Sequence, residues 1–284
     1  MLIALASVKG SPGVTTFTAA LAATWPLTVR RLIVECDPAG GDLAHRFGLR
    51  STPGLLSLAA AARGSTEPEV LWNHAQPLPG GTQIVSGPPG SHQARAALGV
   101  LTASGSPVYG AGRESDVAIF ADCGRMDPGS PAEPLIRHAD ILLLLSGTHN
   151  DELAHLAGRI PELGRTATRP CLVLTGDGHP TAEVERELGI PVMARIPHDP
   201  ATALAGHGVA GRRGKGGLVR AAGVVARVLL GEAIPTQAAD FPHPPAVGSQ
   251  IPGVPPQQLR TSSVRGAPPE LLHNGVVLRK DASS

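Results

Sequence analysis

The residues best suited to chemistry lie near the amino terminus, in the run from Lys9 to Thr16 that reads Lys-Gly-Ser-Pro-Gly-Val-Thr-Thr. This run follows an apolar segment, 1–8, which we predict to be a buried strand, and precedes a helical pattern. Backbone N–H groups at such a turn converge on an anion, and the helix end adds partial positive charge. Gly10 and Gly13 allow the backbone to approach phosphate closely, and the Thr15 hydroxyl suits Mg²⁺. The run therefore predicts a phosphate-binding loop.

Val14 departs from the usual form of such a loop. In an ordinary phosphate-binding loop a lysine stands directly before the hydroxyl residue and reaches the β- and γ-phosphates. Valine offers neither a charge nor a hydrogen-bond donor. Where nothing replaces the lysine, its loss removes about 2–3 kcal/mol of nucleotide affinity or transition-state stabilisation.

The loop resembles that of the ParA/MinD family of deviant Walker A ATPases, whose motif is Lys-Gly-Gly-x-Gly-Lys-Thr-Thr. Lys9 matches the family's signature lysine, which reaches across a dimer to the partner's nucleotide. Pro12 fills the free position, whereas Ser11 and Val14 depart from the motif. The resemblance implies ATP and Mg²⁺ as cofactors, with nucleotide-binding residues Lys9, Gly10, Ser11, Gly13, Val14, Thr15 and Thr16.

Two later segments resemble the family's acidic motifs. The segment 33–43 resembles its second motif, in which Asp37 matches the residue that orients the attacking water and senses the γ-phosphate. The segment 116–124 resembles a Walker B strand, whose terminal Asp122 would hold Mg²⁺ through its water shell. The resemblance thus implies Asp37 and Lys9 as catalytic residues, and Thr15, Asp122 and Asp37 as the metal site.

The resemblance extends to the late segment 190–199, where Pro197 would lie near the base of the nucleotide. It covers about residues 1–231, with a degenerate loop. Within the family, the loop and a proline-rich extension look most like the TadZ/CpaE-type localisation proteins of pilus and secretion systems, which are partners of a secretion ATPase.

Each acidic residue also has a simpler reading. Asp37 could cap the helix after it, and Asp122 could cap a loop. Glu35, inside an apolar strand, could pair with an arginine. Arg125 could face phosphate in place of the missing lysine, or could be a solvated loop residue.

Short apolar runs alternate with helical patterns along the first 231 residues. The predicted strands are 2–8, 29–36, 83–86, 117–121, 141–146, 171–175 and 192–196. The predicted helices are 15–24, 55–63, 92–101, 151–163, 181–188 and 218–230. This alternation predicts an α/β fold with a mostly parallel sheet, and continuous apolarity indicates strands covered on both faces. We therefore predict a doubly wound sheet, which the resemblance places among P-loop NTPases of the SIMIBI type.

Composition divides the chain into a domain, 1–231, and a proline-rich tail, 232–284, which we predict to be disordered. The net charge of +1 gives no overall attraction to nucleic acid or anionic lipid. The three cysteines lie in apolar runs without ligand spacing, as free thiols of a reducing cytosol would. No window is long and apolar enough for a membrane span, so we expect a cytoplasmic protein without direct membrane binding.

Three functional hypotheses follow. The first is a homodimeric ATP-binding switch that positions a pilus or secretion machine and hydrolyses ATP slowly or not at all, or a nucleotide-free scaffold of the same fold. The second is a partitioning protein that binds DNA nonspecifically through Arg212, Arg213 and Lys215. The third is a true ATPase in which Arg125 or Lys9 substitutes for the absent lysine.

Overall fold

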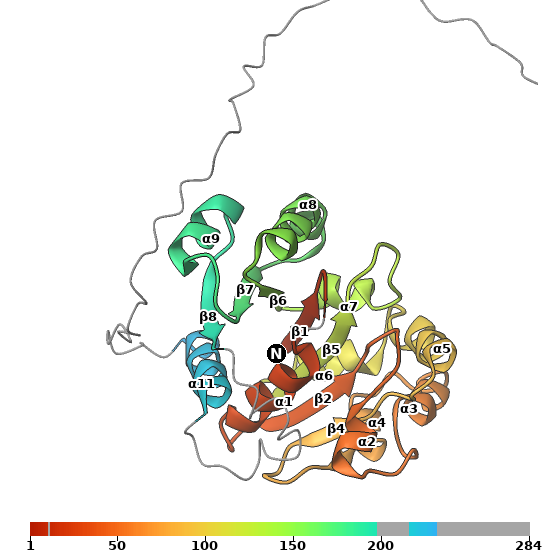
Figure 1. The fold of residues 1–284 in the computed structure, drawn as a ribbon. Coiled ribbons are helices and arrows are strands. Elements are labelled where there is room, and N and C mark those ends of the chain that lie inside the picture. Colours follow the sequence, from red (N-terminus) through yellow and green to blue (C-terminus); the bar gives the residue numbers. More distant parts are fainter. Residues whose placement is uncertain (11, 198–215, 232–284) are drawn as a thin grey trace, which may run out of the picture. The chain divides into compact units, whose positions relative to one another are not determined.

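The computed structural model describes residues 1–10, 12–197 and 216–231. Their strands form one eight-stranded sheet in the order β3-β4-β2-β5-β1-β6-β7-β8 (Figure 1). The strands are β1 Leu2–Ser7, β2 Arg30–Glu35, β3 Gln76–Pro77, β4 Gln83–Val85, β5 Val117–Arg125, β6 Ile141–Gly147, β7 Pro170–Thr175 and β8 Val192–Ile196. All neighbouring pairs are parallel except β3 with β4. The predicted mostly parallel sheet is confirmed.

Helices cover both faces of this sheet. Those described are α1 Val14–Thr24, α2 Leu43–Phe47, α3 Leu55–Ala61, α4 Val70–Asn73, α5 Ser91–Leu101, α6 Pro107–Gly112, α7 Glu133–His138, α8 Asn150–Thr166, α9 Thr181–Leu188 and α11 Gly217–Leu229. None of them is long and apolar enough to cross a membrane. The doubly wound architecture is therefore confirmed within the described residues.

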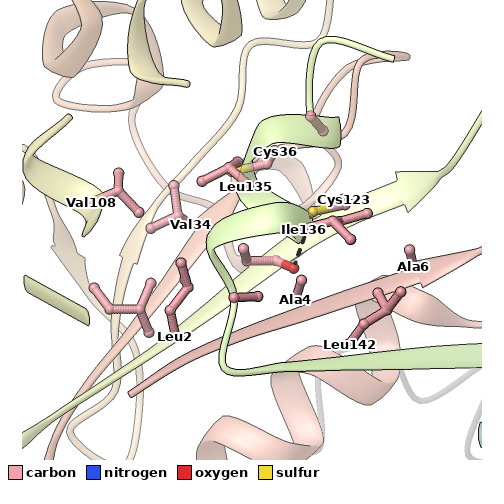
Figure 2. Close-up of a cluster of buried hydrophobic side chains, with 14 of the residues drawn as sticks. Leu2, Ala4, Ala6, Val34, Cys36, Val108, Cys123, Leu135, Ile136 and Leu142 are labelled. Atoms are coloured by element: carbon pink, nitrogen blue, oxygen red, sulfur yellow. Dashed lines mark hydrogen bonds between the residues drawn. The ribbon is translucent and has the colours of Figure 1, made fainter. Parts of the chain in front are cut away.

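Two apolar cores lie on opposite faces of the sheet, because side chains of a strand alternate between its faces. Ile3 and Leu5 of β1 join the core formed with α1 and α11. Leu2, Ala4 and Ala6 join the core formed with α3 to α9. Figure 2 shows part of the second core, where Val108 of α6 and Ile136 of α7 pack near β1.

The differences from the predicted elements concern short segments. The two-residue strand β3 and the short helices α4, α6 and α7 were not predicted, because four to six residues do not establish a period. Strand β5 continues past Asp122 to Arg125, four residues beyond its predicted end. The cysteines Cys36, Cys123 and Cys171 are free and buried, as expected.

Candidate functional site

A cleft of about 1290 Å³ opens at the carboxyl ends of the parallel strands. Residues from the segments after β1, β2, β5, β6, β7 and β8 all line it. The strand order reverses here, because the chain moves from β1 outward to β2 and β4 and later to β6, β7 and β8 on the other side. Crevices at such a reversal point are the usual ligand sites of open α/β sheets.

The predicted phosphate loop lies in this cleft, with Gly10, Gly13, Thr15 and Thr16 in its lining. Gly10 and Gly13 have φ angles of 71° and 91°, which favour glycine. The N–H groups of the first three residues of α1, 14–16, make no hydrogen bond to any described part of the chain, and no side chain caps the helix. Its first turn also carries no acidic residue. This helix end is therefore free to receive an anion. Ser11 lies outside the described residues.

Val14 also lines the cleft, but its side chain belongs to the apolar core. It is 6% exposed and packs in the apolar core with Phe17 and Leu21 of the same helix. Thr15 and Thr16 remain half-buried beside it. The valine side chain thus packs in the core, and its backbone N–H is the group that it can offer to an anion at the loop.

Asp122 lies fully buried in β5, and burial raises the pKa of its carboxyl to about 7. The Thr15 hydroxyl and the Gly124 N–H lower this pKa, while Glu35 and Asp37 raise it. Its Oδ1 accepts a hydrogen bond from Gly124 at 3.3 Å, so the predicted loop-capping role is present in part. Its Oδ2, however, is buried without a hydrogen-bond partner in the described structure.

A buried oxygen without a partner is costly unless a ligand or water satisfies it. Mg²⁺ is usually bound through carboxylates and retained waters. Asp122 lies close enough to Thr15 for that hydroxyl to affect its pKa, so a carboxylate and a hydroxyl meet beside the phosphate loop. These residues fit the predicted magnesium site.

Asp37 lies half-buried in the cleft lining, at the loop after β2. Its Oδ1 accepts the N–H of Ala39 at 2.7 Å, and a Cβ on Gly124 would collide with its carboxyl group. The carboxyl therefore lies directly on the end of β5. Burial and the charge of Asp42 raise its pKa, whereas the Ala39 N–H and Arg125 lower it. The alternative of a helix cap does not hold, because Asp42 is the N-cap of α2.

Glu35 binds backbone rather than the arginine suggested by the sequence. Its Oε1 accepts N–H groups of Asp42 at 2.6 Å and Leu43 at 2.9 Å, and its Oε2 accepts that of Gly87 at 2.8 Å. Burial raises its pKa, and these three N–H groups oppose the rise. Glu35 thus joins the amino end of α2 to the loop after β4. Its partners were missed because backbone donors leave no mark in side-chain patterns.

Lys9 does not line the cleft. Its Nζ forms an exposed ion pair with Oδ2 of Asp151, at 3.2 Å, in the first turn of α8. This contact lowers the pKa of the Asp151 carboxyl. The catalytic role of Lys9 across a dimer stays a prediction.

Among the described residues, three arginines line the cleft. Arg125 is exposed and pairs with Asp127 at 3.0 Å, which fits the solvated reading. Arg95 of α5 and Arg46 of α2 were not predicted as site residues. Arg46 belongs to a helix of five residues, and no helical period identifies which way such a helix faces.

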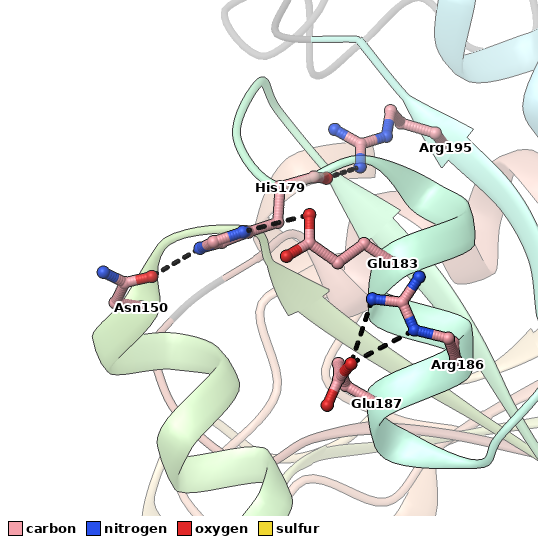
Figure 3. Close-up of polar contacts among 6 residues, drawn as sticks. All are labelled: Asn150, His179, Glu183, Arg186, Glu187 and Arg195. Carbon is pink, nitrogen blue, oxygen red and sulfur yellow. Dashed lines mark hydrogen bonds and ion pairs between the residues drawn. The ribbon is translucent and has the colours of Figure 1, made fainter. Parts of the chain in front are cut away.

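The far end of the cleft is formed by the segments after β7 and β8. Pro197 lines it and packs on the start of α11, since a Cβ on Gly217 would collide with its ring. Figure 3 shows that Arg195 of β8 donates to the carbonyl of His179, and His179 in turn meets Asn150 and Glu183. This network fixes the loop after β7. Residues 198–199 of the predicted late motif, and Arg212, Arg213 and Lys215, lie outside the described residues.

No family model matches this sequence, and no curated protein matches it. Solved structures do match. A ParA family ATPase from Chlorobium tepidum TLS matches with a TM-score of 0.64 and 18% identity, over 79% of this chain and 98% of that one. The septum site-determining protein MinD of Pyrococcus horikoshii OT3, complexed with Mg-ADP, matches with a TM-score of 0.61 and 18% identity, over 80% and 95%.

A variant of McdA from Cyanothece in complex with ATP matches with a TM-score of 0.60 and 15% identity, over 83% of this chain and 98% of that one. These matches span nearly the whole of each solved chain, and their sequence identities are low. What they share with this protein is the arrangement of strands and helices around the cleft. The chain has the fold of the ParA and MinD ATPases.

Proposed function

We propose that this protein is a ParA/MinD-like switch that binds ATP·Mg²⁺, hydrolyses it slowly or not at all, and positions a macromolecular machine in the cell. Support comes from the fold, from the cleft at the reversal point of the sheet, and from solved structures of the same fold that hold Mg-ADP or ATP. The name of one of them, a septum site-determining protein, describes a positioning role for that protein.

One observation carries nucleotide binding: the free end of α1 lines the cleft, and beside it Oδ2 of the buried Asp122 has no hydrogen-bond partner in the described structure. Among the described residues, the first three N–H groups of α1 have no acceptor, and Oδ2 of Asp122 has no hydrogen-bond partner. An anion could bind the N–H groups, and a cation or water could bind the oxygen. A phosphate chain with its magnesium ion satisfies both needs at once. A strand-to-helix turn that binds no ligand would leave both the N–H groups and the carboxylate oxygen without partners.

Slow turnover follows from the position of Val14. Its side chain is in the core, so the loop itself places no cation on the phosphates. Charge stabilisation of this kind contributes about 2–3 kcal/mol in enzyme sites, and its absence slows the chemical step by roughly tens- to hundredfold. Asp37 is still present to orient water, so residual hydrolysis depends on it.

The proposed assembly is a nucleotide-sandwich homodimer, with a secretion or pilus ATPase as partner, as in the TadZ/CpaE-type branch. The degenerate loop and the proline-rich segment 232–284 support this assignment. DNA binding through Arg212, Arg213 and Lys215 is a weaker proposal, because no feature of the described residues favours it.

Isothermal titration with ATP·Mg²⁺ tests the proposal, with Asp122→Asn as the matched variant. We expect the unaltered protein to bind at submillimolar nucleotide, and Asp122→Asn to lose the magnesium dependence of binding. Phosphate release should be slow and should fall further in Asp37→Ala. No binding at millimolar nucleotide would contradict the proposal and support a nucleotide-free scaffold. Fast turnover would contradict slow hydrolysis and support a true ATPase.

A further inference from the structure

We propose that Arg46 of α2 supplies the phosphate-facing positive charge that Val14 does not, so that the cation reaches the nucleotide from the segment after Asp37. This inference rests on the proposed nucleotide binding and deepens it: it concerns the affinity for the phosphates and leaves the slow chemical step unchanged. The cation would belong to the same subunit but to a different element from the loop.

The contacts of Arg46 place its guanidinium at the phosphate loop. Its Nη1 donates to Oγ1 of Thr16 at 3.1 Å, and its Nη2 lies 3.4 Å from Oδ2 of Asp42. Thr16 belongs to the same first turn of α1 whose N–H groups are free. Arg46 and Thr16 both line the cleft. The guanidinium therefore lies beside the anion position while its side chain is 35% exposed.

The other cations near the cleft are less suited. Lys9 pairs with Asp151 and does not line the cleft, and Arg125 pairs with Asp127. Arg95 lines the cleft from α5 and makes no hydrogen bond or ion pair to the described residues of the loop. Among the described residues, Arg46 is the cleft-lining cation that is hydrogen-bonded to the first turn of α1.

The position of Arg46 is set before any ligand arrives. Glu35 holds the amino end of α2 through the N–H groups of Asp42 and Leu43, and Leu43 is buried in the core below α1. A preorganised guanidinium loses little freedom on binding and offers two parallel N–H donors to a phosphate. The partner to be displaced is Asp42, which is 71% exposed and readily solvated. Phosphate would therefore replace Asp42 as the anion on Arg46.

Calorimetry with ATP·Mg²⁺ and with inorganic tripolyphosphate tests this contact. Arg46→Met removes the charge and keeps an unbranched side chain, and it should weaken both ligands about tenfold or more. Arg46→Lys should recover part of the loss. Arg186→Met is the matched control, because Arg186 forms an exposed ion pair with Glu187 on α9, outside the cleft. It should bind as the unaltered protein does.

A second variant gives a change in the opposite direction, which misfolding cannot imitate. Asp42→Asn removes the competing anion, and its side chain makes no capping hydrogen bond to α2. It should tighten tripolyphosphate binding severalfold in the unaltered background and much less in the Arg46→Met background. Equal gains in both backgrounds, or unchanged affinity in a folded Arg46→Met, overturn the role of Arg46 while nucleotide binding stands. Failure of the unaltered protein to bind either ligand overturns both proposals.

Discussion

At the scale of single residues, two buried acids on neighbouring strands meet different surroundings. Glu35 and Asp122 stand opposite each other in the β2–β5 register. Glu35 accepts three backbone N–H groups, whereas Asp122 accepts the N–H of Gly124 and its Oδ2 has no hydrogen-bond partner among the described residues. Glu35 therefore has its hydrogen-bond partners within the chain and has a structural role. Asp122 leaves one oxygen for a ligand or a water molecule.

The pKa of Asp122 predicts pH-dependent magnesium binding. Burial raises this pKa to about 7, and Mg²⁺ requires the ionised carboxylate. Binding of ATP·Mg²⁺ should therefore tighten as pH rises from about 6 to 8 and should release a proton near pH 6. Calorimetry in buffers of different ionisation enthalpy measures this proton. Asp122→Asn should release less, and an equal release from the variant would contradict the assignment.

The same shift fixes the sign of the stability change in the metal-free protein. Because the folded pKa lies above the ordinary value of 3.8, the unfolded chain loses this proton first as pH rises. Asp122 therefore destabilises the fold progressively between about pH 4 and pH 7. Added Mg²⁺ and nucleotide should offset this loss, which thermal unfolding at pH 5 and pH 7.5 with and without ATP·Mg²⁺ measures.

At the scale of elements, α11 and α1 cover one face of the sheet together. Val225 of α11 is fully buried in their shared core, while the adjacent Val224 is half-buried. Helix α1 begins at the phosphate loop, so its packing against α11 bears on the rigidity of that loop.

Val225→Ala should lower the free energy of unfolding by about 2 kcal/mol, because it removes buried methyl groups and leaves a cavity. Val224→Ala, on the same helix and of the same chemistry, should cost less than half as much. Urea unfolding of the two variants measures the difference. Equal losses would mean that α11 does not pack on α1 as described.

How well each element was predicted depended on its length and burial. The apolar runs of β1, β5 and β6 are covered on both faces, so composition alone indicated them. The helices α4, α6 and α7 have four to six residues and pack where the sheet leaves room, so tertiary contact determines them. Arg46 was not predicted as a site residue for the same reason, because its position at the phosphate loop depends on the short helix α2.

At the scale of the whole molecule, the topology gathers residues that are far apart in the sequence. Thr15 follows β1, Asp37 follows β2 and Asp122 lies in the last part of β5, and the order β2-β5-β1 makes those strands neighbours. The motifs predicted this meeting. They did not predict that Lys9 would lie outside the cleft, because its direction depends on Asp151 at the start of α8.

The proposed sandwich dimer predicts nucleotide-dependent self-association. Lys9 is exposed in part and, among the described residues, pairs with an exposed carboxylate, so it can leave Asp151 at little cost. Sedimentation should show a dimer with ATP·Mg²⁺ and a monomer without it. Lys9→Ala should stay monomeric with nucleotide, whereas Arg186→Ala should dimerise. A dimer of Lys9→Ala would remove Lys9 from the interface.

The three hydrogen bonds of Glu35 also constrain how the cleft can move. They fasten the chain at Glu35 and again at Asp42 and Leu43, and Gly41 is held by the carbonyl of Pro88 at 2.8 Å. The segment that carries Asp37, residues 36–40, is thus held by hydrogen bonds at both of its ends. We therefore expect this segment to move only between these two points. A larger displacement would have to move the loop at Gly87 with it, because Glu35 is hydrogen-bonded to Gly87.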